Sequence, residues 1–381
     1  MTRRETSDRL EVLAFCDYFG GSSGGIEIAT RNIYNRLADR FDLTVVSGTR
    51  ADTFEGLRVV ASTPIDLSGL LGAQVSFAPG LVFRAWSQLR RNRPAVVHVS
   101  GLHFFGSVVG ATMARTMAIP FVLSMHLGDP AAGGGLVGRA ATLYERLVGR
   151  WMVRHAAAVI AVSESVAQHA RRLGARADRT HVVLNGVDPV LFAPGRDVGS
   201  HNGTARAPRI AVIGRVIGNK GTIEAALALS ESEAEFSAVF VGDGPDTDEL
   251  RRIVAGDPRF ELLGHRDGVE QILASADIFV RYSTTEGRSL AVLEAMSAGC
   301  AVVLSDIPAN SEIVTDGQDG VLVPLGNVMA LRGQIEELVL DPDRVKRLGA
   351  AARQRVLTHG WDVCADGVAS VLRWAGRREP E

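Results

Sequence analysis

The chain has 381 residues, 46% hydrophobic and 22% charged, which is a globular composition on a length that suits two domains rather than one core. Its 41 basic side chains nearly cancel 43 acidic ones, so the formal net charge of −2 gives no general attraction to nucleic acid. Three widely spaced cysteines argue against a disulfide framework and favour a reducing, cytoplasmic compartment. We find neither a signal-peptide pattern nor an apolar run near the roughly 18 residues of a membrane span, so we expect a soluble or membrane-peripheral protein.

Apolar runs of strand length alternate with helical patterns along the chain. Because these runs are apolar on both faces, they indicate parallel strands covered by helices on each side. Two successive series of such units predict an α/β protein with two doubly wound, Rossmann-like parallel-sheet domains. The predicted strands are residues 10–16, 43–46, 95–99, 121–125, 157–162 and 181–184 in the first series, and 210–213, 238–241, 260–263, 278–280, 301–304 and 321–323 in the second.

A stretch without periodicity separates the two series. Residues 192–208 are rich in glycine, proline and small polar residues, which is typical of a linker. We therefore place one domain at residues 1–195 and a second at residues 205–360. Helical spacing resumes over residues 361–376, beyond the last predicted strand.

Glycines at residues 20–25 follow the first predicted strand, and a helical pattern opens at Ile26. Such a turn lets the backbone approach a ligand, and the helix N-terminus offers N–H groups to a phosphate. A purely structural tight turn explains the same residues, and the dinucleotide fingerprint G-x-G-x-x-G is absent. The stretch also fits the hydrolase motif G-x-S-x-G around Ser22 or Ser23, but it follows the very first strand and leaves the second domain unexplained.

Charged residues follow other predicted strands. Arg215 and Lys220 lie in a glycine-containing loop after the first strand of the second domain, where they suit a diphosphate, although solvated surface charges are the alternative. His126 follows another strand, where it is either near a ligand or a structural loop residue. His98 and His103 flank a similar strand end and are further candidates.

The most informative stretch is residues 277–299, in which a strand is followed by a polar loop and then a helix over about residues 289–298. The loop carries Glu286, and the otherwise apolar helix carries Glu294. A buried carboxylate needs a partner, which is either a ligand hydroxyl or a neighbouring basic side chain. A glycosidase pair is disfavoured, because eight residues of continuous helix span about 12 Å, beyond the roughly 5–10 Å between the carboxylates of such pairs.

Two Asp-x-Asp pairs, Asp246 with Asp248 and Asp341 with Asp343, match a pattern that can hold a metal. Acidic residues are also favoured in a first helical turn without any metal, so we interpret both pairs as helix starts. No His/Cys cluster has the spacing of a zinc site, and we assign no metal ligand.

Taken together, these residues resemble the retaining glycosyltransferases of family 4, "glycosyl transferases group one", over nearly the whole chain. Members have the GT-B architecture, in which two Rossmann-like domains face each other across a cleft. The matching components occur in the family's order. They are Gly24-Gly-Ile-Glu27, Val97-His-Val99, Ser124-Met-His126, Ala161-Val-Ser-Glu164, Asn185-Gly-Val-Asp188, Gly214-Arg215 with Lys220-Gly221, Gly242-Asp-Gly-Pro245, and Glu286 with Glu294.

The resemblance implies roles toward a nucleotide-diphosphate sugar donor. Arg215 and Lys220 are expected to hold the diphosphate, Glu286 to contact the transferred sugar, and Glu294 to contact the ribose. Residues 361–381 are expected to cross back onto the first domain. The remaining implied donor-site residues are His126 near the reacting centre, Gly25 in a closing loop, Leu290 and Ala291 with N–H groups toward phosphate, and His265 and Arg266 beside the nucleobase.

The implied reaction transfers the sugar to a glycan, lipid-linked or small-molecule acceptor, with retention and with no metal or other cofactor. Cations and a helix terminus meet the charge of the leaving diphosphate, which accepts the acceptor's proton on the same face of the sugar. The sequence departs from the family at Arg281, where an apolar residue or proline is common, and at Arg288 and Ser289, where Phe and Gly are frequent. These positions flank the sugar pocket and leave the donor sugar open. A non-catalytic nucleotide-sugar binder and an epimerase of the same architecture are the alternatives.

Two segments, residues 81–93 and 136–154, each mix four arginines with two aromatic residues. Such helices suit peripheral contact with an anionic membrane, here the inner face of the plasma membrane. The alternative is that both turn their apolar faces into the core and their arginines into water. The aromatic residues in question are Phe83, Trp86, Tyr144 and Trp151.

Overall fold

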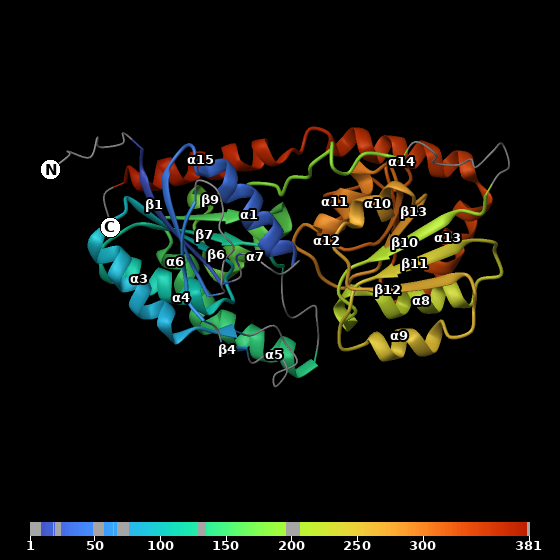
Figure 1. Cartoon of the computed structure of the whole chain (residues 1–381), viewed down its shortest axis with the longest axis horizontal. Coiled ribbons are helices and arrows are strands. Elements are labelled where there is room, and N and C mark those ends of the chain that lie inside the picture. Colours follow the sequence, from blue (N-terminus) through green and yellow to red (C-terminus); the bar gives the residue numbers. More distant parts are fainter. Residues whose placement is uncertain are drawn as a thin grey trace. The chain divides into compact units, whose positions relative to one another are not determined.

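The computed structural model describes residues 9–17, 19, 24–48, 57–63, 65–66, 76–128, 135–195 and 206–378. The chain forms two compact units, one comprising Met1–Asn185 with Trp361–Glu381 and the other comprising Gly186–Gly360. Each unit has its own parallel sheet and its own apolar core (Figure 1).

The first unit is built on a seven-stranded sheet in the order β3-β2-β1-β6-β7-β8-β9, with every neighbouring pair parallel. From β1 the chain moves outward to β2 and β3 and then returns to the other side of β1, so the strand order reverses between β1 and β6. The strands are β1 (Glu11–Cys16), β2 (Asp42–Ser47), β3 (Arg58–Ala61), β6 (Val96–Ser100), β7 (Phe121–Met125), β8 (Ala158–Ala161) and β9 (Thr180–Val182), beside a separate antiparallel pair of β4 (Ile65–Asp66) and β5 (Ser76–Phe77).

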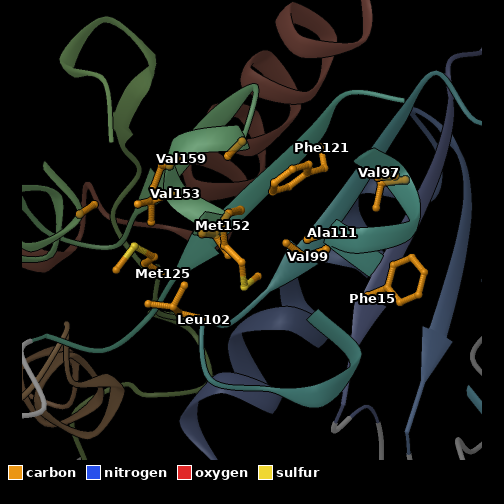
Figure 2. Packing of buried hydrophobic residues seen from close by; sticks show 14 of the residues in the cluster. Phe15, Val97, Val99, Leu102, Ala111, Phe121, Met125, Met152, Val153 and Val159 are labelled. Carbon is orange, nitrogen blue, oxygen red and sulfur yellow. The ribbon is translucent and has the colours of Figure 1, made fainter. Parts of the chain in front are cut away.

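Alternate residues of these strands face one apolar core, in which Phe15, Val97, Val99 and Phe121 pack together (Figure 2). Helix α3 buries a stripe of small and branched residues spaced four apart, so one of its faces closes the core. The helices that supply this core are α3 (Pro79–Arg91), α4 (Phe105–Thr116), α6 (Arg150–His155) and α7 (Glu164–Leu173), and α5 (Gly135–Tyr144) joins α6 through a π-helical segment, Glu145–Gly149. The opposite face of the sheet is covered by α1 (Gly25–Leu37) and α15 (Trp361–Gly376).

Helix α15 packs on β6, β7 and β8 and lies beside α1. Arg36 of α1 forms an ion pair with Asp362 at 2.8 Å, and Arg40, just beyond α1, pairs with Asp366. The two aspartates are largely exposed and the two arginines partly so, and such surface pairs contribute at most about 1 kcal/mol each. Buried apolar residues of α15, including Trp361 and Leu372, therefore account for most of its attachment to the first unit.

The second unit has a six-stranded parallel sheet in the order β12-β11-β10-β13-β14-β15, which reverses between β10 and β13. Its strands are β10 (Arg209–Ile213), β11 (Ser237–Val241), β12 (Phe260–Gly264), β13 (Ile278–Arg281), β14 (Ala301–Ser305) and β15 (Val321–Val323). The core contains residues of α8 (Thr222–Ser230), α9 (Thr247–Ile253), α13 (Val328–Leu340) and α14 (Pro342–Val356), while α10 (Val269–Ala274), α11 (Leu290–Ser297) and the short α12 (Pro308–Ser311) complete the unit.

The twelve predicted strands are all present, with ends within two residues of the predicted ones, and the helix predicted over 361–376 is confirmed. Sequence analysis did not predict β3, because this edge strand has only four residues and none of them is fully buried. The central strands are buried on both faces and therefore appear in the sequence as continuous apolar runs, whereas the residues of β3 are exposed or only partly buried.

The boundary between the units lies earlier than the predicted linker. Residues 186–195 already belong to the second unit, where Gly195 N donates to Ala274 O at 3.1 Å and Ser297 Oγ donates to Phe192 O at 2.9 Å. Residues 196–205 lie outside the described part of the chain. Linker-like composition thus marks the neighbourhood of the change of unit but not its position, because the first few of these residues pack on the second unit.

Candidate active site

The two strands at which the second sheet reverses its order, β10 and β13, each lead into a loop with charged side chains. Arg215 and Lys220 follow β10, and Glu286 follows β13. In open parallel sheets, ligands bind outside the carboxyl ends of the strands at such a switch point. The topology therefore brings Glu286 to the same edge of the sheet as Arg215 and Lys220, from which it is distant in sequence.

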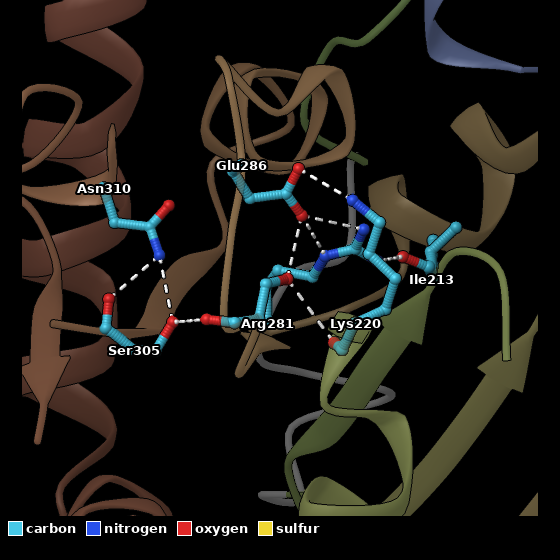
Figure 3. A network of polar contacts seen from close by, with 7 residues as sticks. Ile213, Lys220, Arg281, Glu286, Ser305 and Asn310 are labelled. Carbon is cyan, nitrogen blue, oxygen red and sulfur yellow. Dashed lines mark hydrogen bonds and ion pairs between the residues drawn. The ribbon is translucent and has the colours of Figure 1, made fainter. Parts of the chain in front are cut away.

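The carboxylate of Glu286 lies at the centre of a polar network (Figure 3). Its Oε2 accepts a hydrogen bond from Lys220 Nζ at 2.9 Å. Its Oε1 accepts from Nε and Nη2 of Arg281 at 3.1 and 3.0 Å, and from Ser283 Oγ at 2.8 Å. The remaining guanidinium nitrogen of Arg281, Nη1, donates to Ile213 O at 2.8 Å. The side chains of Arg281 and Glu286 are only 6% and 7% exposed, so this is a buried, densely bonded arrangement.

Two glycines make room for this network. A Cβ on Gly214 would collide with the guanidinium of Arg281, and one on Gly221 would collide with the backbone of Tyr282. Both glycines also have positive φ angles, 146° and 68°, at which other residues are strained. The loops after β10 and β13 can therefore approach this closely only with glycine at both positions.

A chain of buried hydrogen bonds stabilises the loop after β13. Ser305 Oγ donates to the carbonyl oxygen of Ser283 at 2.6 Å, and Asn310 Nδ2 donates to Ser305 O at 2.9 Å (Figure 3). All three side chains are fully buried. Buried groups bonded in this way rigidify the site that they surround. Ser305 and Asn310 were not among the residues predicted from the sequence, because a single sequence carries no signal for a buried polar partner.

The electrostatics of the site follow from these contacts. Burial would raise the pKa of Glu286, but the charges of Lys220 and Arg281 outweigh it and lower the pKa to about 2. Burial lowers the pKa of Lys220, as do the charges of Arg281 and Arg215, while Glu286 opposes them. The side chain of Arg215 is exposed, and no described residue accepts a hydrogen bond from it. Two cations thus contact one carboxylate and a third, Arg215, acts on Lys220, so the excess positive charge suits an anionic ligand.

Helix α11 begins at Leu290, directly after the loop that carries Glu286, and Ala291 follows in its first turn. The side chain of its N-cap, Ser289, makes no capping hydrogen bond. Glu294 lies one turn further on, partly buried, and no residue in the described part of the chain donates a hydrogen bond to its carboxyl group. Burial and the charge of Glu270 raise its pKa to about 7. A carboxyl group in this setting would gain from a ligand that donates hydroxyl hydrogen bonds.

His265 and Arg266 lie on the loop that follows β12, and both are exposed. β12 is an edge strand, and β11 and β10 separate it from β13. The structure therefore brings Arg215, Lys220 and Glu286 to the switch point but places His265 and Arg266 toward one side of the sheet.

In the first unit, His126 follows β7, and its Nε2 is 3.0 Å from Oγ of Ser100, the last residue of β6. Ser100 Oγ in turn lies 3.3 Å from Oγ1 of Thr30 in α1. Burial lowers the pKa of His126 to about 4, so the imidazole is neutral near pH 7. Its Nδ1 is buried, and no partner for it lies within the described part of the chain. Gly25 is the first residue of α1, while residues 20–23, including Ser22 and Ser23, lie outside the described residues.

The other two histidine candidates have buried protein partners. His98 Nδ1 is 2.9 Å from Tyr34 OH and its Nε2 is 2.8 Å from Ser124 Oγ, and burial together with the charge of His126 lowers its pKa to about 3. His103 Nε2 is 3.0 Å from Oε1 of Glu145, a buried carboxylate that sequence analysis did not single out. These contacts assign structural roles to both histidines.

Both aspartate pairs lie at the starts of helices, as predicted. Asp246 precedes the first residue of α9, Asp248 lies in its first turn, and Asp248 pairs with Arg251 at 2.7 Å. Asp341 caps α14 by accepting a hydrogen bond from Arg344 N at 2.8 Å. The first-turn position explains these acidic residues without a ligand.

The two arginine-rich segments differ in what they expose. On α3, Phe83 is 72% and Trp86 45% exposed. In the second segment, Tyr144 OH donates to Leu102 O at 3.0 Å and Trp151 packs against the core, so these two aromatic residues are partly buried and less exposed than those of α3. Within the described residues, no helix combines the length and apolar character that crossing a bilayer requires.

Two family models match the chain and together cover most of it. The model described as "Glycosyltransferase Family 4" matches residues 23–191, and the model described as "Glycosyl transferases group 1" matches residues 207–341. The chain therefore belongs to the family 4 glycosyltransferases, and its two parallel-sheet α/β domains have the GT-B fold.

Individual relatives agree with this assignment. The chain is 28% identical to α-maltose-1-phosphate synthase of Mycolicibacterium smegmatis over 316 residues, which cover 74% of this chain and 80% of the relative. It is 26% identical to sulfoquinovosyl transferase of Arabidopsis thaliana, covering 87% of this chain and 67% of the relative. Among solved structures, Anabaena HepE in complex with UDP-glucose matches with a TM-score of 0.77 and 22% identity, covering 96% of this chain and 100% of that one.

Proposed function

We propose that this glycosyltransferase moves a sugar from a nucleoside-diphosphate donor, with retention of configuration and without a metal ion. The observation that carries the proposal is the partly buried Lys220–Glu286 pair at the switch point of the second sheet, with Arg215 exposed on the same loop as Lys220. Cations for a diphosphate and a carboxylate for a sugar hydroxyl are the two kinds of group that such a donor requires at adjacent positions. The complex of HepE with UDP-glucose supports a donor of this class.

Each residue has a distinct role in this proposal. Lys220 and Arg215 hold the diphosphate, assisted by the N–H groups of Leu290 and Ala291 at the start of α11. Glu286 accepts a hydrogen bond from the transferred sugar, and Glu294 accepts hydrogen bonds from the ribose. Two further assignments come from the family resemblance: His126 contacts the substrate as a neutral imidazole, and His265 and Arg266 border the nucleobase.

In the proposed reaction, the bond between the anomeric carbon and the diphosphate oxygen breaks as a bond from that carbon to the acceptor hydroxyl oxygen forms on the same face. The acceptor's proton passes to the leaving phosphate. Charge on the leaving group grows in the transition state, and Lys220 and Arg215 stabilise it there without a metal. The donor supplies the proton acceptor, so no protein nucleophile is needed.

The donor class is tested by thermal unfolding in the presence of UDP-, GDP- and ADP-sugars. A ligand that binds only the native state at about 100 times its Kd stabilises it by about 2.7 kcal/mol. We expect one nucleotide class to raise the Tm of the wild type, and the Lys220→Ala variant to lose this shift. Absence of a shift with every donor, or an unchanged shift in the variant, would contradict the proposed donor site.

We further propose that α3 contacts an anionic membrane surface and thereby brings the enzyme to a lipid-linked acceptor. Leu81 is buried in the core, whereas Phe83 and Trp86 stay exposed on the same helix with Arg84 and Arg90. The guanidinium of Arg90 lies 4.4 Å from the ring centre of Trp86. Exposed aromatics among arginines are the groups that insert at a lipid interface and attract its charge.

Sedimentation with anionic and neutral vesicles tests this contact. The wild type is expected to bind vesicles that contain phosphatidylglycerol at low salt, and the double variant Phe83→Ser with Trp86→Ser is expected to lose most of that binding. Val363→Ser is the matched control, because Val363 is 62% exposed but lies in α15, outside both arginine-rich segments. Failure of the wild type to bind anionic vesicles at low salt would exclude the contact.

A further inference from the structure

Arg281 is a charged residue at the end of a fully buried strand, and each of its three guanidinium nitrogens donates a hydrogen bond within the second unit. Nε and Nη2 bond to Oε1 of Glu286, and Nη1 bonds to Ile213 O. A buried guanidinium is costly unless it is paired and hydrogen-bonded in this way. Gly214 provides the space, because a Cβ there would lie within clashing distance of Nη1. The surroundings of Arg281 are thus fitted to hold it in one place.

The two cations that contact Glu286 differ in their freedom to move. Lys220 lies on the loop after β10, its side chain is 19% exposed, and it makes one 2.9 Å bond to Oε2. Arg281 is only 6% exposed and is bonded at three nitrogens. Ser283 Oγ reinforces the bond to Oε1. Oε1 is therefore held by fixed groups, whereas Oε2 is held by the one cation that can turn to another anion.

We propose that Arg281 is a positioning residue of the donor site, which keeps Glu286 charged and oriented while Lys220 leaves it to bind the donor diphosphate. Oε2 then accepts a hydrogen bond from a hydroxyl group of the transferred sugar instead of from Lys220. Oε1 keeps its hydrogen bonds from Arg281 and Ser283. This inference rests on the proposed donor site. It also specifies the donor, whose transferred sugar must present a free hydroxyl to Oε2, so a deoxy analogue at that position binds poorly.

The charges around Glu286 give the proposal a pH dependence. Lys220 and Arg281 are the charged groups that face its carboxylate, and Arg215 acts on Lys220 from further out. Burial favours the neutral form of Glu286, and these two cations reverse that preference. If Arg281 is removed, departure of Lys220 leaves a buried carboxylate without a charged partner. Such a group takes up a proton, and a neutral carboxyl group is a weaker acceptor for the sugar.

The pH dependence of kcat at saturating donor, which reports groups of the enzyme–donor complex, tests this role in Arg281→Met and Arg281→Lys. An opposite charge within about 4–6 Å lowers a carboxyl pKa by about 1–3 units. In Arg281→Met one cation is lost by mutation and the second moves to the donor, so the pKa of Glu286 rises from about 2 by about 2–6 units and the acid limb falls at about pH 4–8. The wild type should show no such limb. Arg281→Lys keeps the positive charge but loses the hydrogen bonds from three nitrogens. Its KM for the donor should therefore rise, while its pH profile, like that of the wild type, should show no such acid limb.

The matched control is Arg259→Met. Arg259 also forms a partly buried pair in the second unit, with Asp257 at 2.7 Å, and lies over the ring of Phe236, but it is outside the Glu286 network. Its loss is expected to lower the Tm without moving the acid limb. If folded Arg281→Met had the wild-type pH profile, or if Arg259→Met acquired the same acid limb, the positioning role of Arg281 would be overturned.

Proton uptake on nucleotide binding tests the same exchange without turnover. Calorimetric titration with UDP, and with GDP and ADP in parallel, at about pH 6 in buffers of different ionisation enthalpy should show up to about one more proton taken up by Arg281→Met than by the wild type. Equal uptake by both proteins would overturn the inference alone. Failure of the wild type to bind any of the three nucleotides would overturn the proposed donor site, and the inference with it.

Discussion

Replacement of Glu294 by glutamine is expected to stabilise the protein at high pH and not at low pH. Burial and Glu270 raise the pKa of Glu294 from 4.5 to about 7, so the folded state binds its proton more tightly than the unfolded chain does. The resulting stability is fully present below pH 4.5 and is lost as the pH rises through about 7. Each pKa unit corresponds to about 1.4 kcal/mol, and we take about 1–3 kcal/mol because the side chain is partly exposed. Glutamine has no carboxyl group to ionise, so the stability of Glu294→Gln should not fall as the pH rises through about 7.

Chemical denaturation of the wild type and Glu294→Gln from about pH 5 to 9 measures the difference. In thermal unfolding of a domain of this size, a stability difference of about 1–3 kcal/mol would correspond to a Tm shift of roughly 2–12 °C. Glu235→Gln serves as the control, because Glu235 is an exposed glutamate of the same unit. A stability difference between Glu294→Gln and the wild type that stayed constant over this pH range, or an equal effect in Glu235→Gln, would refute the reasoning.

Three further predictions concern the reaction. Lys220→Ala should lower kcat about 100- to 1000-fold, because it removes charge stabilisation that grows as the nucleotide leaves, and steady-state kinetics with unchanged kcat would contradict this. Activity should persist in EDTA. Complete loss of activity in EDTA that Mn²⁺ or Mg²⁺ restores would show that a metal is required. Because burial lowers the pKa of His126 to about 4, the imidazole is neutral above that pH, and kcat should show no limb from its titration between about pH 5.5 and 8. If the wild type did show a limb in this range and His126→Asn lacked it, His126 would titrate there and the prediction would be wrong.

The fold was largely predictable from the sequence for a physical reason. Strands of parallel sheets are buried on both faces, so β6, β7 and β14 appear as continuous apolar runs. The edge strand β3 lacks this signal, since its neighbours cover it only partly. Strand order was not predictable in detail, because it depends on how the helices pack rather than on any local pattern.

Charged residues of the second unit were predicted as individual candidates, but their contacts were not. Lys220 and Glu286 stand 66 positions apart and meet only because β10 and β13 are neighbours in the sheet. Arg281 was recognised as a departure from the family pattern, yet its bonds to Glu286 depend on the space that Gly214 leaves. The partial burial of the aromatic residues in the second arginine-rich segment was not predicted, because helical spacing does not reveal that Tyr144 reaches a backbone carbonyl.

The most direct test of the proposed function is release of free nucleoside diphosphate from UDP-, GDP- and ADP-sugars, measured with a panel of glycan, lipid-linked and small-molecule acceptors. The wild type is expected to release one nucleotide only when a suitable acceptor is present, and Lys220→Ala is expected to release it at least about 100-fold more slowly. Anomeric proton couplings of the product should match those of the donor. Acceptor-dependent release at the same rate in Lys220→Ala, or a product of inverted configuration, would contradict the proposed mechanism.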